Sequence, residues 1–226
     1  MLLFKRNALL KTVLGILIVT CCTINSFAFW VFNTTENGFT GTKSLSSTEA
    51  SIGDLIVQGG AAFLDSYSST LQYMKKTESA SLLGVNQSEL LTLLKKALSS
   101  MTLATGYYSK LKAVAAVTPY NSSVIDVLKT FDYDAFLKSN EGYINPAVFD
   151  EVKGYLIVGD IRGIYTKIYT DSVQIESLIN RLIDLTNAGV IPSMPETYKV
   201  NHLFSQTLLF GQYTAQVFNT ITKSIR

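Results

Sequence analysis

His202 is the only histidine of the chain, so triad or histidine-bound metal chemistry would depend on it. No Gly-x-Ser-x-Gly motif accompanies it, and Lys199 stands where a Glu-x-x-His di-iron pattern needs glutamate. We therefore predict no catalytic residue, no metal site and no cofactor. The favoured interpretation of His202 is a histidine at or near the surface, and the alternative is a ligand-binding role.

A second group that could do chemistry lies within the most apolar long segment: Asp160, Arg162, Lys167 and Asp171. Lys167 and Asp171 are four residues apart, so they can pair along one helical face. One interpretation is a polar cavity that orients a ligand, and the other is an ordinary solvated face. The candidate ligand-binding residues are Asp160, Arg162, Tyr165, Tyr169 and His202.

Helices must position these residues, because apolar side chains recur every three or four residues from Ser46 onward. Three capping boxes mark helix starts: Ser46 with Glu49, Asn86 with Glu89 and Ser193 with Glu196. Three features predict helix ends: Pro119, Asn140-Glu141-Gly142 and Gly189. The predicted fold is all-α, an up-and-down bundle of four long helices plus one short helix.

The longest periodic segment opens at Asn145-Pro146 and runs from Val148 to about Leu185. Proline suits the first helical position, because its missing N–H donor is harmless there. Three glycines, Gly154, Gly159 and Gly163, predict a kink or break near Asp160. The short helix is expected from Asn121 to about Phe136.

Four glycines fall within apolar helical stripes: Gly59, Gly60, Gly163 and Gly211. Glycine inside a helix costs about 1 kcal/mol relative to alanine. Close helix contact, either within the bundle or between chains, would explain why glycine stands at these positions.

The first 28 residues have the layout of a secretory signal. Lys5, Arg6 and Lys11 precede the apolar run Thr12–Val19, and Ser26-Phe27-Ala28 supplies small residues at a cleavage site. Cleavage after Ala28 would make Phe29 the new first residue. We therefore predict a signal at 1–28, a linker at 29–45 and a helical domain at 46–226.

Two other interpretations of the first segment stay open. Residues 12–32 are long and apolar enough to act as an uncleaved membrane anchor. Cys21 would be the lipidated residue of a lipoprotein, although Thr20 fits the preceding position poorly.

Removal of the signal changes both charge and cysteine content. Loss of Lys5, Arg6 and Lys11 leaves 16 basic against 17 acidic residues, a net charge of −1 in place of +2. The apparent basicity belongs to the signal and gives no support for nucleic-acid binding. Cys21 and Cys22 are the only cysteines, so the mature domain would have no disulfide.

These observations predict an exported, non-catalytic helical protein in the periplasm, at the cell surface or secreted. Its function would be binding or assembly with a protein or small ligand outside the cytoplasm. One alternative is a membrane-active or self-assembling protein, whose long helices with Gly59, Gly60, Gly163 and Gly211 would repack against lipid or other copies. Separately, residues 12–32 would contact a membrane if uncleaved, and the chain could form a homo-oligomer. The other is a ligand- or cofactor-binding bundle that uses His202 and the charges from Asp160 to Asp171.

Overall fold

The structure is a computed structural model that describes residues 47–83, 86–118, 120 and 122–224. The predicted signal, cleavage site, anchor, linker and lipidation site therefore lie outside the described residues. Within those residues every element is a helix, so the predicted all-α class is confirmed. The helices are α2 (Ser47–Leu83), α3 (Gln87–Val117), α4 (Ser122–Thr130), α5 (Tyr133–Ser139), α6 (Pro146–Leu156), α7 (Ile161–Asn187) and α8 (Met194–Ser224).

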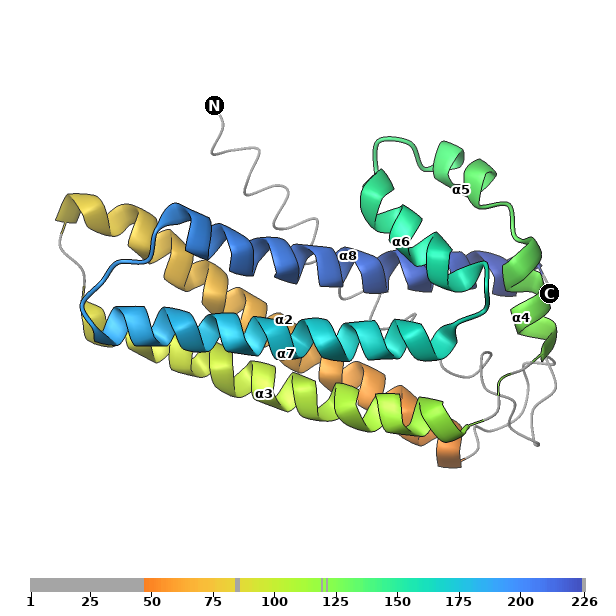
Figure 1. Cartoon of the computed structure of the whole chain (residues 1–226), viewed down its shortest axis with the longest axis horizontal. Coiled ribbons are helices and arrows are strands. Elements are labelled where there is room, and N and C mark those ends of the chain that lie inside the picture. The colour runs from red at the N-terminus through yellow and green to blue at the C-terminus, as the bar shows by residue number, and fades with distance from the viewer. Residues whose placement is uncertain (1–46, 84–85, 119, 121, 225–226) are drawn as a thin grey trace.

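The four long helices α2, α3, α7 and α8 run along the long axis of the molecule (Figure 1). Along the chain these four helices alternate in direction (Figure 1). The ends of α2 and α7 and the starts of α3 and α8 lie at one end of the molecule, and α4 lies at the other. The described part of the chain thus has four long and three short helices, two more short helices than predicted.

One added helix arises from the break that the glycines predicted near Asp160. Gly159 has a φ of +71°, a backbone conformation that glycine adopts without strain. The Asp160 carboxylate then accepts a hydrogen bond from Gly163 N at 2.8 Å and caps the start of α7. The segment from Val148 to Leu185 is therefore two helices, α6 and α7.

The other added helix arises at Asp132, within the segment predicted as one short helix. The Asp132 carboxylate accepts a hydrogen bond from Ala135 N at 2.8 Å and starts α5. Aspartate favours helix starts because its side chain satisfies a free backbone donor. The helix predicted from Asn121 to Phe136 is thus α4 followed by α5.

Four other predicted helix boundaries are confirmed, whereas the start predicted at Ser46 lies outside the described residues. The Asn86 side chain caps α3, and the Asn145 side chain caps α6 with Pro146 in its first turn. Gly189 has a φ of +71° and follows the end of α7. The Glu196 carboxylate accepts a hydrogen bond from Ser193 N at 3.0 Å at the start of α8.

Gly59 lies where α2 and α3 approach each other. A Cβ atom at Gly59 would lie 2.8 Å from Cε1 of Tyr108 and 3.3 Å from Cβ of Tyr107. Ser66 adds a contact on the same helix pair, because its hydroxyl donates to the carbonyl of Ala97 at 2.8 Å. A missing side chain at position 59 therefore lets α3 pack closely on α2.

The other three glycines differ from Gly59. A Cβ atom at Gly211 would meet no atom of the described residues within 4 Å. A Cβ atom at Gly163 would contact Asp160 and Tyr155, which come from the adjacent turn and from α6. Gly60 is half-buried on α2.

We expect Gly106→Ala to stabilise the protein and Gly59→Ala to give no such gain. Gly106 lies on α3, and a Cβ atom there would meet nothing within 4 Å, so alanine should add about 1 kcal/mol through helix propensity. Alanine at position 59 would press on Tyr108 and lose that gain. Urea unfolding of both variants checks this, and an equal gain at both positions would show that Gly59 is not tightly packed.

The apolar core has two parts along the molecule. On α7, buried residues of one part end at Tyr165 and those of the other begin at Ile175. On α8 the corresponding change falls between Phe204 and Phe210. The buried polar residues Asp171 and Thr207 lie between these limits, so a polar level separates the two apolar parts.

Candidate functional site

Asp171 is the centre of a polar cluster in the interior. Asp171 is only 6% exposed. Lys167 Nζ lies 3.0 Å from Asp171 Oδ2. Thr207 on α8 donates its hydroxyl to the same oxygen at 2.9 Å. The predicted pairing of Lys167 with Asp171 is confirmed, and Asp171 lies in the interior, not on a solvated face.

Lys167 also binds a second carboxylate, Glu151 on α6, at 3.1 Å. Its ammonium lies 5.3 Å from the centre of the Phe210 ring on α8. Burial alone would lower the pKa of Lys167, but the hydrogen bonds and charges of Asp171 and Glu151 outweigh burial and raise it. Lys167 is therefore a fixed cation that joins α6, α7 and α8.

The spacing of apolar residues on α7 contains a signal for this buried aspartate. Ile164, Ile168, Asp171 and Ile175 follow one another at intervals of four, three and four residues. An aspartate at that register falls on the apolar stripe, and a buried carboxylate requires a partner. Thr207 could not be found in this way, because its contact with Asp171 joins two different helices.

Three of the five predicted ligand-binding residues surround Tyr120, which sequence reasoning did not single out. The guanidinium of Arg162 lies 5.6 Å from the Tyr120 ring centre. Burial raises the pKa of Tyr120, Arg162 opposes that rise, and Asp160 adds to it through its charge. Burial likewise raises the pKa of Tyr165, with a smaller contribution from Tyr120.

The groups around Tyr120 have structural contacts. The Tyr120 hydroxyl donates to the carbonyl of Ala115 at 2.6 Å, near the end of α3. Asp160 caps α7, and the side chain of Arg162 lies over the Tyr120 ring. This arrangement fixes the chain between α3 and α7 at the end of the molecule that holds the short helices.

Tyr169 and His202 have ring contacts with residues other than Tyr120. Lys112 on α3 lies 4.7 Å from the Tyr169 ring centre. His202 is exposed and stacks on Tyr198, one turn earlier on α8, with ring centres 5.5 Å apart. That all five residues form one ligand site stays a prediction. Among the described residues, no group of three or more His, Cys, Asp and Glu side chains could hold a metal ion.

We expect His202→Ala to change the free energy of unfolding by less than about 0.5 kcal/mol, as is usual for exposed positions. The variant should also keep the metal content and absorption spectrum of the parent protein. Thermal unfolding and elemental analysis of both proteins check these expectations. Loss of a bound metal or chromophore in the variant would assign chemistry to His202.

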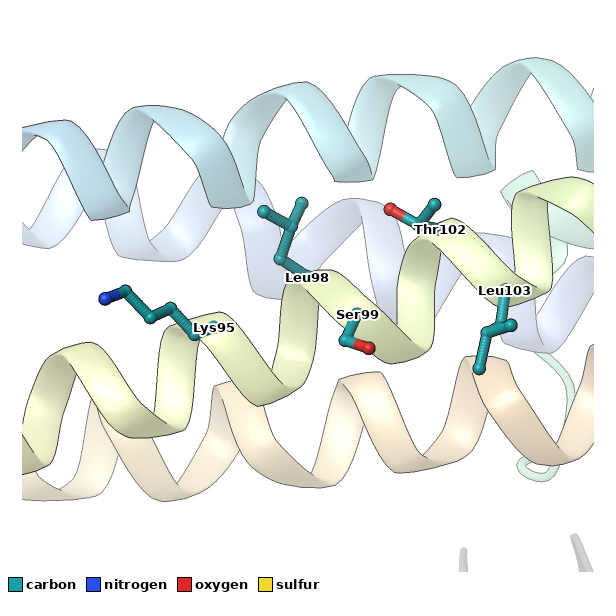
Figure 2. A pocket seen from close by; sticks show the side chains of 5 residues that line it. All are labelled: Lys95, Leu98, Ser99, Thr102 and Leu103. Atoms are coloured by element: carbon teal, nitrogen blue, oxygen red, sulfur yellow. The ribbon is translucent and has the colours of Figure 1, made fainter.

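A hollow on the outer face of α3 is a further surface feature (Figure 2). Its lining residues are Lys95, Leu98, Ser99, Thr102 and Leu103. All five come from one helix, whereas ligand sites usually gather polar groups from several elements around an enclosed space. Thr102 donates its hydroxyl to Glu176 at 2.7 Å, which ties this face to α7.

Large exposed apolar side chains gather at the connection between α7 and α8. We call this surface the α7–α8 corner, and it consists of Val190, Ile191, Met194 and Tyr198. Their exposed fractions are 49%, 53%, 81% and 63%. Single exposed apolar residues are ordinary on protein surfaces, but four within nine residues make this surface a candidate for binding.

The backbone of the α7–α8 corner is held by hydrogen bonds on both sides. Val190 N donates to the carbonyl of Leu185 at 2.9 Å and closes the end of α7. Glu196 accepts from Ser193 N and pairs with Arg181 of α7 at 3.1 Å. These contacts lower the pKa of Glu196, chiefly through the backbone bond from Ser193. The turn therefore presents its apolar side chains from a defined backbone.

Sequence reasoning did not find the α7–α8 corner. Pro192 and Pro195 marked a turn, and isolated apolar residues around two prolines carry no periodic signal. Only the packed structure distinguishes Ile191 and Met194 from the buried residues nearby.

Comparison with known proteins finds no matching family model, no similar curated protein and no similar solved structure. None of the described helices combines the length and apolar character needed to cross a bilayer. Functional inference therefore depends on the described surfaces and on the sequence.

Proposed function

We propose that this chain is an exported, non-catalytic helical-bundle protein that binds a partner in the cell envelope. In this proposal the four long helices form an up-and-down bundle that supports a binding surface. The α7–α8 corner is the observation that carries the proposal, because it exposes four large apolar side chains on a hydrogen-bonded turn.

The sequence supports export. Lys5, Arg6 and Lys11 precede a short apolar run, and Ser26-Phe27-Ala28 follows it at the distance of a cleavage site. The mature chain would then begin at Phe29 and carry a net charge of −1.

Binding is favoured over catalysis because the interior polar groups serve to hold helices together. Lys167 and Asp171 pair with each other, and both also contact neighbouring helices through Glu151 and Thr207. The alternative of a cofactor site needs His202 beside these charges. His202 instead stacks on Tyr198 at the surface, so that alternative receives no support.

A photo-cross-linking amino acid at position 194 tests the proposal in cells of the source organism. The matched control is position 117, because Met194 and Val117 are 81% and 80% exposed. We expect covalent adducts with an envelope component from position 194 and none from position 117. Equal yields at the two positions, or no adduct at 194, would contradict the proposal.

A further inference from the structure

We propose that the α7–α8 corner inserts into the interfacial region of a lipid bilayer. This inference rests on the proposed function, because it names the chemical class of the envelope partner. It concerns a turn that touches the membrane surface and is independent of whether residues 12–32 act as an anchor.

The size of the corner favours lipid over a protein partner. Four partly exposed side chains offer on the order of a few hundred Å² of apolar surface. A stable protein interface buries about 800 Å² on each partner, most of it on a surface broader than one turn. Insertion of apolar side chains into lipid needs no matching surface, so a small apolar tip is sufficient.

The position of the corner suits insertion. The connection between α7 and α8 lies at one end of the long axis, so a membrane that meets this end would contact the corner together with the C-terminal end of α2 (Figure 1). Its hydrogen-bonded backbone keeps Ile191 and Met194 outside the core, so insertion requires no unfolding of either helix.

The side-chain types also fit the boundary between water and hydrocarbon. Val190, Ile191 and Met194 supply aliphatic surface, and Met194 adapts its shape easily. Tyr198 joins an apolar ring to a hydroxyl and suits the level of the lipid headgroups.

The charged residues near the corner balance one another, so we expect it to have little preference for anionic over neutral lipid. Arg181 pairs with Glu196, and the exposed residues Lys199 and Asp184 carry opposite charges. Apolar burial would then drive binding, so salt and anionic lipid should change it little.

Tryptophan fluorescence of the full chain tests this inference. Trp30 is the only tryptophan, so Trp30→Phe removes all native tryptophan fluorescence. In this protein Met194→Trp is the reporter at the corner, and Val117→Trp is the matched control at a similarly exposed position. Both reporters are read with phosphatidylcholine vesicles, with and without phosphatidylglycerol, and again with brominated acyl chains. We expect a blue shift and about twofold or greater quenching at position 194, and neither change at position 117.

Ile191→Glu added to the Met194→Trp protein should abolish the shift and the quenching while leaving circular dichroism unchanged. Absence of quenching at position 194, or equal quenching at positions 194 and 117, would overturn the inference. It would also be overturned if lipid-free sedimentation showed self-association that Ile191→Glu removes, because the corner would then contact a second copy. A protein adduct from position 194 without lipid quenching would retain the proposed function and reject the lipid.

Discussion

Raising the pH from about 10 to about 12 should remove roughly 5 kcal/mol from the free energy of unfolding. Burial raises the pKa of Tyr133 and Tyr165 far above the ordinary value of 10.0. Both residues are less than 5% exposed, so solvent does little to screen the effect. Smaller shifts in the same direction occur at Tyr73, Tyr120 and Lys167.

The direction of the change follows from proton linkage. Above pH 10 the unfolded chain loses the proton of each tyrosine, whereas the folded chain keeps it, so the unfolded state binds fewer protons. Each retained proton lowers stability by about 1.4 kcal/mol per pH unit. The stability linked to Tyr133 and Tyr165 is therefore fully present below pH 10 and is lost as pH rises toward their folded pKa values.

Urea unfolding at a series of pH values, with tyrosinate absorbance recorded in parallel, measures this slope. Tyr165→Phe should make the free energy of unfolding fall less steeply above pH 10. The difference should correspond to about one fewer proton, or about 1.4 kcal/mol per pH unit. Tyr143→Phe is the matched control, because Tyr143 is almost fully exposed, and this change should leave the slope as it is in the parent protein. A slope that Tyr165→Phe leaves unchanged would show that Tyr165 ionises freely in the folded chain.

Lys167→Met should lower the free energy of unfolding by about 3 kcal/mol. The change leaves the buried Asp171 carboxylate with the Thr207 hydroxyl and no cation, and breaking a buried ion pair typically costs 3–5 kcal/mol. The lower end of that range applies, because the Lys167 side chain is partly exposed. Thermal or urea unfolding measures the loss.

A double variant isolates the reason for that loss. Lys167→Met combined with Asp171→Leu removes both charges and should return to within about 1 kcal/mol of the parent protein. Glu151→Gln is the control, because it removes the other, more exposed carboxylate that pairs with Lys167. It should lower the free energy of unfolding by less than about 1 kcal/mol. A Lys167→Met variant as stable as the parent would mean that Asp171 is well solvated.

Local chemistry made most helix boundaries predictable. Asn145-Pro146, Gly189 and the break before Asp160 each depend on capping or on a φ value that neighbouring residues decide. Asp132 was missed as a helix start because the apolar pattern continues across it from α4 to α5.

Contacts between helices were less predictable. Periodicity identifies an apolar face but does not say which helix covers it, so the bond between Thr207 and Asp171 was not foreseen. The approach of Tyr108 to Gly59 gives this glycine a close contact with a neighbouring long helix, whereas a Cβ atom at Gly211 would meet none of the described residues within 4 Å. Asp160, Arg162, Tyr165 and Tyr169 were grouped because they are close in sequence, and His202 was added because it is the only histidine. The Tyr120 ring beside Arg162 comes from a distant part of the sequence, so it was not foreseen.

Hydroxyl-radical footprinting in isolated envelopes tests most directly whether the α7–α8 corner is a binding surface. Met194 and Tyr198 report on the corner, and the exposed residues Leu103 and Tyr143 report on surfaces away from it. The account predicts that oxidation of Met194 and Tyr198 slows about tenfold relative to the free chain, since a bound partner excludes water. Leu103 and Tyr143 should react at the same rate in both samples. Unchanged oxidation of Met194 and Tyr198, or equal slowing at all four residues, would contradict a partner bound at this corner.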